Sequence, residues 1–375
     1  MVLDLEADLL RDRGHRVERF VVSNTDLPEA TLRTGLETVW SHRSYRRLRR
    51  ELRKRKPDLA HVHNTFPRLS PSVYWAMAAE GVPVVQTLHN YRLTCANALL
   101  MRDGRPCEEC VGRFPLPALR YRTYRDSLAA TGAVVAMQVA HRKLGTYKNK
   151  VDAYIALTEF ARSLMVRSGL PEERVHVKPN FIPDPLPAMG SLPERKRQII
   201  FVGRVAHEKG VDLLLEAWNR LKPSARLVIV GDGPEQIRLR REYRNLPGVE
   251  WHGWLEREQV LREIAASRYL AMPSRWYETL GMVLIEALSL GTPVVVPGHA
   301  GFPEIITPGR TGMLFSPGDG GDLARVIDRA LRFDDTEWQR WSDDARRLFL
   351  SRYSEEANYR RLVTIYEKAI EHARK

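Results

Sequence analysis

The sequence predicts an α/β fold of two doubly wound domains, each a parallel sheet covered by helices. Its 375 residues exceed what one hydrophobic core usually holds, which favours two domains. Short apolar runs bounded by turn residues alternate with amphipathic stretches in both halves, as they do where helices cover both faces of a parallel sheet. Residues 181–198 carry four prolines between the halves and form the predicted linker region.

The predicted elements follow from these runs. In the first half, strands are predicted at 15–23, 57–64, 82–90 and 151–158, and helices at 3–12 and 72–80. In the second half, strands are predicted at 197–204, 226–233, 249–254, 268–274, 292–298 and 311–317, and helices at 210–221, 258–266, 282–290 and 320–332. The short strands and longer helices fit βαβ units in both halves.

These elements divide the chain into an N-terminal domain at 1–182, a linker at 183–198 and a C-terminal domain at 199–375. The last helix could cross back to the first domain. Open α/β sheets bind ligands beyond the carboxyl ends of their strands. We therefore expect substrates in a cleft formed where the two domains face each other.

The composition indicates what kind of molecule the protein binds and in which cellular compartment it works. A net charge of +13 predicts attraction to an anion, whether nucleotide phosphates, a membrane surface or nucleic acid. No apolar run approaches the ~20 residues that span a bilayer, and the N-terminus lacks a signal pattern. Three cysteines cannot all pair within the chain, which fits a reducing compartment. These observations predict a cytoplasmic protein.

Glu286 stands inside the apolar run "GMVLIEALSL", and Glu278 precedes it by eight positions. A carboxylate among apolar side chains is costly to bury unless donors surround it, and the two hydroxyls of a ribose would serve. The alternatives are a solvated helix face or an Arg partner. Gly281 is expected to open this helix and Gly291 to follow its C-cap.

Two stretches could bind phosphate. The amides of Thr279, Leu280, Gly281 and Met282 would start the helix, where free N–H groups and the helix dipole favour an anion. In "FVGRVAHEKGVD", Gly203 ends a strand, and Arg204 and Lys209 precede a helix, so the two cations could hold a diphosphate. The alternative is that both cations are ordinary exposed loop charges.

Together these stretches resemble glycosyltransferase family 4, the glycosyl transferases of group 1, which are retaining enzymes of the GT-B fold. The resemblance extends from the first helix to the chain end. It depends on Gly203-Arg204 with "EKG" at 208–210, on "GDGPE", on Glu278 and Glu286, on "GTPVVVPGHAGFPEII" and on "TGMLFSPGD". Several spaced motifs in this order are more specific than any one of them.

The resemblance implies a role for each residue. Arg204 and Lys209 would bind the donor diphosphate, Glu286 the ribose, and Glu278 the region of the donor sugar, while the amides of 279–282 would hold the distal phosphate. Fixed donors around the leaving diphosphate would lower the barrier. No metal or cofactor beyond the nucleotide-sugar donor is expected, and the chain contains no Asp-x-Asp.

The first half supplies further candidates. His89, at the end of the strand "VPVVQT", would lie near the transferred sugar by the same resemblance, with a core histidine as the alternative. Asn180 matches a Pro-Asn turn and is expected to be structural. Cys95, Cys107 and Cys110 could hold a structural zinc with His141 or a carboxylate as fourth ligand, and a reduced, metal-free trio is equally compatible.

The expected activity is that of a hexosyltransferase-type enzyme acting on a lipid-linked or surface-polysaccharide acceptor. The basic segment 43–56, with 120–126, Lys148 and Lys150, is either a solvated face or a contact for an anionic membrane or lipid diphosphate. Rival interpretations are a nucleotide-sugar epimerase of the same fold and a non-catalytic binding protein. No nucleic-acid motif is found.

The start of the chain departs from the family pattern. A domain of this family ordinarily begins with a hydrophobic strand and a Gly-rich loop, whereas this sequence opens in the first helix, at "MVLDLEADLL". We therefore expect the N-terminal sheet to lack a strand, and Met1 to be an internal start with roughly 15 to 25 residues upstream, the length of a strand plus a loop.

Overall fold

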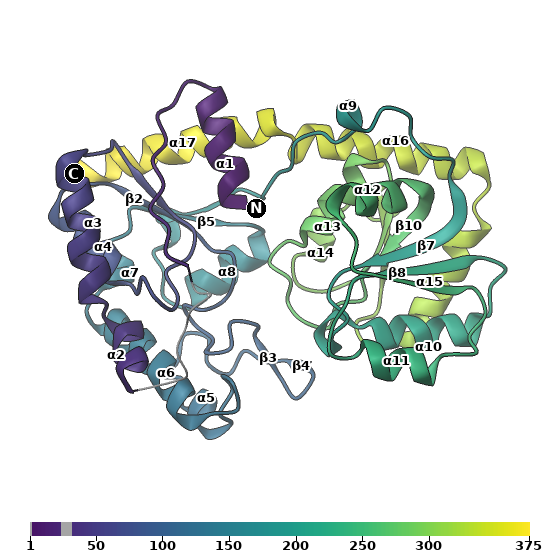
Figure 1. Ribbon diagram of the computed structural model, residues 1–375, viewed down its shortest axis with the longest axis horizontal. Coiled ribbons are helices and arrows are strands. Elements are labelled where there is room, and N and C mark those ends of the chain that lie inside the picture. Colours follow the sequence, from purple (N-terminus) through teal and green to yellow (C-terminus); the bar gives the residue numbers. More distant parts are fainter. Residues whose placement is uncertain (1, 24–31) are drawn as a thin grey trace. The chain divides into compact units, whose positions relative to one another are not determined.

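The computed structural model describes residues 2–23 and 32–375 (Figure 1). The chain forms two compact units. Met1–Arg102, Cys107–Lys178 and Tyr359–Lys375 make up the first unit, and Asp103–Pro106 and Pro179–Asn358 the second. The main division thus falls at Lys178 instead of residue 182, and the end of the last helix belongs to the first unit. The proposed internal start at Met1 lies outside the described residues.

The first unit contains a four-stranded parallel sheet. Its strands lie in the order β1 (Ala60–Val62), β2 (Val84–Thr87), β5 (Ala153–Ala156), β6 (Val175–Val177). The two central strands, β2 and β5, are buried throughout, whereas every residue of the edge strand β1 is partly exposed. The runs at 57–64, 82–90 and 151–158 therefore each contain a strand, as predicted.

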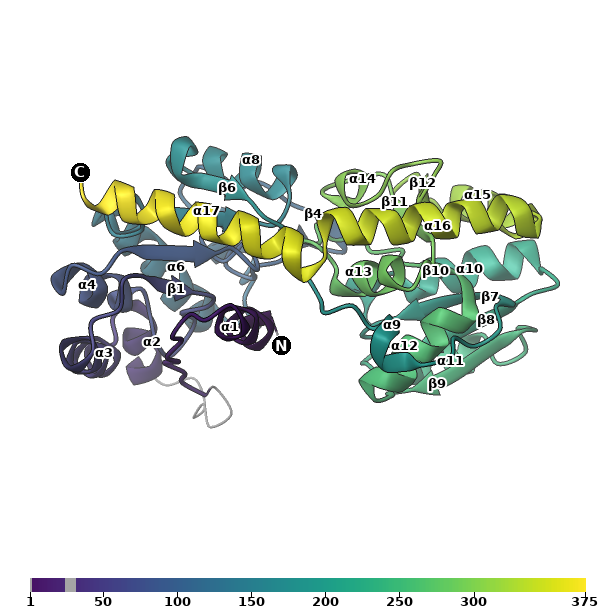
Figure 2. The same ribbon diagram turned by 90° about the horizontal axis from the view of Figure 1, so that it is seen from above.

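Helices cover this sheet. Figure 2 shows α17 (Glu355–Ala373) lying along it, where Leu362, Ile365 and Ala369 pack with side chains of β2 and β5. The other helices of this unit are α1 (Val2–Asp12), α2 (Leu32–Val39), α3 (His42–Lys54), α4 (Ser72–Ala79), α5 (Leu116–Arg120), α6 (Leu128–Lys143), α7 (Thr146–Asn149) and α8 (Glu159–Arg167). A hairpin of β3 (Met101–Arg102) and β4 (Arg105–Pro106) follows β2.

The prediction of a strand at 15–23 was wrong. These residues have no regular secondary structure, although their apolar alternation is typical of a strand. An extended segment becomes a strand only where a neighbour completes its backbone hydrogen bonds, and within the described residues β1 pairs with β2 alone. The short strand β6, in turn, was not among the predicted elements.

The second unit contains a six-stranded parallel sheet in the order β12-β11-β10-β7-β8-β9. Its strands are β7 (Lys196–Val202), β8 (Arg226–Val230), β9 (Val249–Gly253), β10 (Ser267–Ala271), β11 (Val294–Pro297) and β12 (Gly312–Phe315). All six predicted runs of this half form strands. The order reverses between β7 and β10, which is the doubly wound arrangement with a switch point at the sheet centre.

The helices of the second unit lie on both faces of this sheet (Figure 1). They are α9 (Leu186–Met189), α10 (Val211–Leu221), α11 (Gln236–Glu242), α12 (Arg257–Ala266), α13 (Met282–Ser289), α14 (Phe302–Ile305), α15 (Gly320–Arg332) and α16 (Asp335–Arg352). Helix α10 packs beside α15, and α16 packs on α13. Two tryptophans of α16, Trp338 and Trp341, join the core formed by β7, β8, α10 and α15.

Gly210, which precedes α10, shows why the "EKG" motif needs glycine. Its φ is +72°, and a Cβ built there would lie 2.1 Å from the carbonyl oxygen of Pro273. Both atoms belong to backbone, so neither a rotamer change nor a side-chain shift relieves the overlap. Gly210 therefore allows the loop after β7 to pass close to the loop after β10.

We predict that Gly210→Ala destabilises the second unit far more than Gly318→Ala. Gly318 has a similar φ of +75° but nothing within 4 Å of its Cβ position, so it should lose only the ~1–2 kcal/mol of a left-handed non-glycine residue. Gly210→Ala should lose roughly 1–3 kcal/mol more through overpacking. Urea unfolding of both variants measures the difference, and equal losses would contradict the close-approach argument.

Candidate functional site

The predicted donor-site residues of the second unit gather at the switch point of its sheet. Gly203 and Arg204 directly follow β7, and the segment from Ser274 to Gly281 follows β10. These strands are neighbours, so their carboxyl ends open at the same place. Ligands of doubly wound sheets bind there.

A third loop, "GDGPE", packs against the first. The amide of Val205 donates a 2.9 Å hydrogen bond to the carbonyl of Asp232, and the amide of Glu235 donates to the carbonyl of Val205 at 3.1 Å. A Cβ on Gly231 would lie 2.1 Å from the carbonyl oxygen of Gly203. The glycine of this motif therefore permits contact between two loops.

The carboxylate of Glu278 is surrounded by donors. Its Oε1 accepts hydrogen bonds from Lys209 Nζ, from Trp276 Nε1 at 2.7 Å and from Ser274 Oγ at 3.1 Å. The side chain is only 7% exposed. The structure thus brings together two predicted residues, Lys209 and Glu278, which come from different strand ends.

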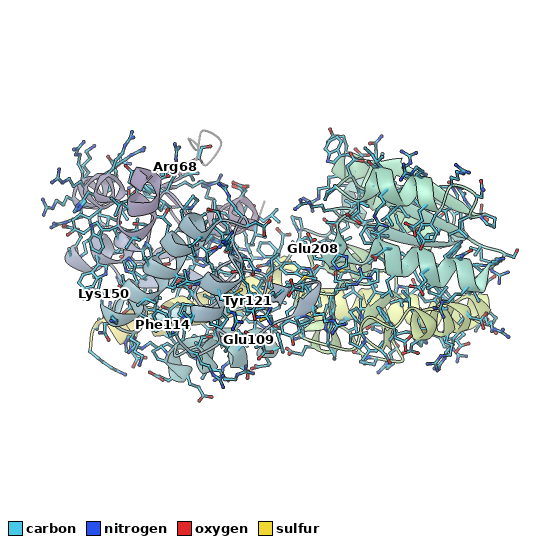
Figure 3. The ribbon with its side chains drawn as sticks, turned by 90° about the horizontal axis from the view of Figure 1, so that it is seen from below. Arg68, Glu109, Phe114, Tyr121, Lys150 and Glu208 are labelled. Atoms are coloured by element: carbon cyan, nitrogen blue, oxygen red, sulfur yellow. The ribbon has the colours of Figure 1, made fainter. Side chains whose placement is uncertain are left out.

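Arg275 holds the same two loops together, and sequence reasoning did not identify it. Its guanidinium donates to both carboxylate oxygens of Asp212, at 2.6 and 2.9 Å, and its amide donates to the carbonyl of Glu208 at 2.9 Å (Glu208 is labelled in Figure 3). Burial is the largest influence on Asp212 and opposes its ionisation, but the hydrogen bonds and charge of Arg275 together with the backbone amide of Leu213 outweigh it, so the pKa of this carboxyl is lowered. The Arg275–Asp212 pair therefore fixes the loop that carries Lys209.

Glu286 differs from Glu278, because no such donor reaches its carboxylate in the described part of the chain. Its side chain is 12% exposed, and the nearest cation, Arg257 Nε, lies 3.9 Å away, beyond hydrogen-bond distance. Burial raises the pKa of Glu286, and the charge of Arg257 offsets only part of the shift. The Arg partner considered for Glu286 is therefore present, but only as a loose pair with Arg257. The carboxylate can still accept hydrogen bonds.

The helix start beside Glu286 has the predicted geometry. Gly281 is the N-cap of α13 with φ +77°, and Gly291 follows the C-cap Leu290 with φ +64°. The first amides of a helix have no partner within the helix, and Met282 is the first helical residue. Thr279 and Leu280 precede it and are buried.

Two other residues complete the description of this unit. Arg204 is exposed. Asn180, expected to be structural, is 4% exposed and directs its Nδ2 at the sulfur of Met282, 3.5 Å away. Its Oδ1 is buried without a hydrogen-bond partner among the described residues. The Pro-Asn turn thus reaches the start of α13.

The first unit contains a buried polar cluster at the carboxyl edge of its own sheet. Glu6 Oε1 accepts a 2.7 Å hydrogen bond from Lys178 Nζ, and both side chains are almost fully buried. Glu6 Oε2 lies 3.1 Å from Nε2 of His63, and His63 Nδ1 lies 2.8 Å from Nε2 of His89. The predicted site residue His89 is therefore linked to three residues that sequence reasoning missed.

The alternating pattern of "AHVHN" could have revealed part of this cluster. Residues two apart in a strand face the same side, and the rings of His61 and His63 lie 4.4 Å apart. Burial lowers the pKa of His61 to about 3 and that of His89 to about 4. Both rings are therefore neutral at pH 7.

The cysteines do not come together as a three-ligand group. Within the described part of the chain, the side chains that bring three ligand atoms within 4.8 Å of one another are those of Glu6, His61 and His63. His141 uses both ring nitrogens elsewhere, at 2.9 Å from Thr146 Oγ1 and 2.8 Å from the carbonyl of Val39. In this structure it is a core histidine and not a fourth zinc ligand.

Comparisons with known proteins agree with this architecture. Anabaena HepE in complex with UDP superposes with a TM-score of 0.64 at 18% identity, over 86% of this chain and 82% of that one. A glycosyltransferase from Rickettsia africae superposes with a TM-score of 0.67 at 16% identity, over 97% and 87%. The fold is GT-B, with two Rossmann-like units.

Family models match almost the whole chain in two consecutive parts. Residues 2–184 match Glycosyltransferase Family 4, and residues 186–348 match Glycosyl transferases group 1. The chain belongs to glycosyltransferase family 4, as the motifs predicted, and is a glycosyltransferase.

Two relatives show the range of similarity. An alpha-D-kanosaminyltransferase of Streptomyces kanamyceticus is 27% identical over 88% of this chain and 81% of its own length. A sulfoquinovosyl transferase of Arabidopsis thaliana is 38% identical, over 35% of this chain and 26% of its own length. In the described residues, no helix combines the length and apolar character needed to cross a bilayer.

We predict that Glu286→Gln weakens the binding of a nucleoside diphosphate, for which UDP is a convenient probe. The substitution keeps the shape of the side chain but removes the charge, and hydrogen bonds to a charged group are worth roughly 1.5–3 kcal/mol each. The dissociation constant should therefore rise by about 10-fold or more. Calorimetry with UDP measures it, and Glu258→Gln, at an exposed residue of α12, is the matched control.

Glu286→Gln should also change how the affinity for UDP depends on pH. Ribose hydroxyls that donate hydrogen bonds to Glu286 would favour its ionised form. Affinity for UDP should therefore fall as pH drops through the raised pKa of this carboxyl. UDP itself also titrates, so the informative quantity is the difference between the unmodified protein and Glu286→Gln. Identical pH profiles, or an unchanged dissociation constant in a folded variant, would contradict a ribose contact.

Proposed function

We propose that this glycosyltransferase transfers a hexose, with retention of anomeric configuration, from a nucleoside-diphosphate sugar to a hydroxyl of a lipid-linked or growing surface saccharide. The observation that carries the proposal is the contact between Lys209 and Glu278 at the switch point, in the same unit as Glu286, whose carboxylate has no hydrogen-bond donor among the described residues. Retention is inferred from the family resemblance of the Glu278 and Glu286 motif.

The arrangement suits a diphosphate leaving group. Arg204 and Lys209 supply positive charge, and the amides at the start of α13 supply donors, so charge developing on the departing phosphate oxygens would be stabilised by the protein. Glu286 would accept the ribose hydroxyls. Glu278, with its donors on one oxygen, would face the sugar, and we propose that no metal is needed.

The proposed donor class agrees with the neighbouring structures. HepE was solved with UDP, and also with UDP and glucose, and the kanosaminyltransferase name describes sugar transfer. We propose a UDP-sugar as the first donor to test. His89 would act near the transferred sugar, from the first unit.

A panel of nucleotide sugars, with UDP-glucose first, tests the proposal. Release of nucleoside diphosphate is measured with and without a saccharide acceptor, and the anomeric configuration of the product is read by NMR. Interconversion of the sugar without any acceptor would favour the epimerase, and absence of both turnover and donor binding would favour a non-catalytic protein. An inverted product would overturn retention.

We predict that Arg204→Ala lowers turnover strongly without destabilising the fold. Arg204 is exposed on a loop, so its loss should change stability by no more than about 0.5 kcal/mol. Loss of one donor to developing charge costs roughly 100-fold in kcat. Arg220→Ala, at an exposed ion-paired residue of α10, is the control and should keep full turnover.

Lys209 requires a different design, because Lys209→Ala would leave Glu278 buried without its cation and would lower stability as well. The double variant Lys209→Met with Glu278→Gln removes both charges together. A melting temperature close to normal with turnover lost would support catalytic roles. Turnover retained by Arg204→Ala or by this double variant would contradict the assigned roles.

A basic face on α3 supports a membrane-associated acceptor. Ser41 caps this helix, Leu48 and Leu52 are buried in the unit, and the opposite side is exposed and rich in arginine. Its exposed cations are Arg43, Arg46, Arg47, Arg50, Arg53 and Lys54. Glu80 pairs with Arg49 and Arg53, and Glu51 pairs with Lys54. Among the described residues, Arg43, Arg46, Arg47 and Arg50 have no carboxylate within 4 Å, so most of the arginine charge of this face is uncompensated. We propose that this face binds an anionic membrane at which the enzyme works peripherally.

We predict that charge reversal on this face releases the protein from anionic vesicles. Each basic residue near such a surface contributes up to about 1 kcal/mol, so Arg43→Glu, Arg46→Glu and Arg50→Glu together should weaken binding by at least about 10-fold. The control reverses three exposed arginines of α15, namely Arg325, Arg329 and Arg332.

Sedimentation with phosphatidylglycerol vesicles at two salt concentrations measures the effect. Binding should fall at higher salt, because exposed charges are screened over ~10 Å at 0.1 M. Equal binding to neutral phosphatidylcholine vesicles, or equal loss in the α15 control, would contradict the electrostatic contact.

A further inference from the structure

The buried cluster of the first unit contains a carboxylate oxygen without a partner. Glu6 is almost fully buried, and its Oε1 accepts a 2.7 Å hydrogen bond from Lys178. Its Oε2 has no hydrogen-bond partner among the described residues. Buried polar atoms are rarely left in this state, because water cannot replace the missing bond. A positively charged ligand would therefore suit this oxygen.

Two imidazole nitrogens lie close to the same oxygen. Nε2 of His63 is 3.1 Å from Oε2 of Glu6, and Nδ1 of His61 is 3.7 Å from it. One ligand atom from each of the three residues lies within 4.8 Å of the other two. Neither nitrogen forms a hydrogen bond with Oε2. Three atoms that can each offer a lone pair thus meet without a proton that joins them to this oxygen.

These spacings suit a zinc ion. Zinc binds imidazole nitrogen and carboxylate oxygen at about 2.0–2.2 Å, so two ligand atoms of a tetrahedral site are separated by roughly 3.3–3.6 Å. The distances of 3.1 and 3.7 Å to Oε2 lie on either side of this range. Two imidazoles with one carboxylate also favour zinc over calcium or magnesium, which prefer oxygen ligands.

The ligands come from two neighbouring elements. His61 lies in the edge strand β1 and His63 directly follows it, so both side chains are on the same side of the strand. Their rings are 4.4 Å apart. Glu6 is a buried residue of α1. An ion bound by all three would fasten the first helix to the end of the edge strand.

The other nitrogen of each histidine already has a partner, as is usual for metal ligands. Nε2 of His61 lies 2.7 Å from Oγ1 of Thr87, and Nδ1 of His63 lies 2.8 Å from Nε2 of His89. Such contacts fix the orientation of a ring and can hold the proton on the nitrogen that faces away from the metal. Both rings are therefore oriented before an ion binds.

Two neighbours limit the affinity. Burial opposes ionisation of Glu6, but Lys178 and the histidines outweigh it and keep the pKa of this carboxyl well below its usual range. Lys178 thus maintains the ionised ligand, yet its own charge repels a cation. Tyr366 Oη lies 2.8 Å from Nδ1 of His61, and this contact would give way to the ion. We therefore expect zinc that a chelator can remove.

We propose that Glu6, His61 and His63 form a structural zinc site that fastens α1 to the end of β1. Oε2 of Glu6, Nδ1 of His61 and Nε2 of His63 are the ligands, and a water molecule completes the tetrahedron. The site lies in the first unit and does not depend on the proposed function. It places zinc at residues other than the three cysteines that the sequence analysis considered.

The full chain, first stripped with EDTA, tests the proposal by zinc calorimetry and by melting with and without zinc. One zinc ion should bind per chain. At a zinc concentration about 100 times the dissociation constant, the melting temperature should rise by roughly 5 to 10 °C. Glu6→Gln and His63→Gln should each weaken binding by at least about 100-fold, since even changes around the ligands cost about 10- to 100-fold.

Lys178→Met provides a result that damage to the fold cannot imitate. This substitution removes the repelling charge and leaves a buried carboxylate that needs a cation. Zinc should therefore bind at least about 10-fold more tightly than in the unmodified protein. It should also raise the melting temperature of this variant by more.

The cysteines are the alternative ligands and are tested separately. Cys107→Ser with Cys110→Ser should leave zinc affinity unchanged, and so should His176→Gln, at a partly exposed histidine of β6. Cobalt absorption gives an independent reading, because thiolate ligands produce a charge-transfer band that nitrogen and oxygen ligands do not. The cobalt-loaded protein should lack this band.

Four results would overturn the proposal. They are absence of zinc binding in the unmodified protein, zinc affinity unchanged in folded Glu6→Gln or His63→Gln, weaker binding in Lys178→Met, and loss of zinc in the cysteine variant. The last result would assign the ion to the cysteines. Each result is obtained without any sugar donor, so failure of this proposal and failure of the proposed function are distinguishable.

Discussion

The arrangement of the proposed donor site depends on the carboxylate of Glu278, which joins the loop after β10 to the loop after β7. Three donors converge on one of its oxygens, and one of them is Lys209 from the other loop. Because the side chain is almost fully buried, loss of either partner would leave a charge in a poorly solvated place. The lysine that would meet a diphosphate is thus fixed before any substrate arrives, which lowers the reorganisation needed in the reaction.

The two glutamates of the motif are therefore in opposite states, although they lie eight residues apart. Glu278 is on a loop and saturated with donors, whereas Glu286 is inside α13, largely buried, and only loosely paired with Arg257. Burial raises its pKa, and Arg257, 3.9 Å away, is too distant to donate a hydrogen bond to the ionised carboxylate. A ligand that brings hydroxyl donors would satisfy it, which is why we propose that Glu278 organises the site and Glu286 recognises the ligand.

Much of the fold and of the candidate site could be predicted from the sequence, because strands and helices follow from the local pattern of apolar and polar residues. All six strands of the second unit and the caps of α13 were predicted, and so were the loops that carry Arg204 and Lys209. The prediction of a strand at 15–23 failed because a strand also requires a neighbouring strand to complete its hydrogen bonds. Apolar alternation does not reveal whether such a neighbour exists. The pair of Glu6 and Lys178 was missed because 172 residues separate them, and only the folded sheet brings them together. His89 was predicted by resemblance, but its contacts were not.

The two units use the same physical solution at the carboxyl edges of their sheets. In each, a lysine beside a strand end neutralises a buried carboxylate, Lys178 with Glu6 and Lys209 with Glu278. Each lysine and its carboxylate together carry no net charge, so these pairs act only on groups close to them and add little to the field far from the protein. The excess positive charge of +13 must therefore lie on other residues. The exposed arginines of α3 carry part of it. Charge that organises the sites and charge that attracts an anionic surface are therefore carried by different residues, and each can be altered without the other.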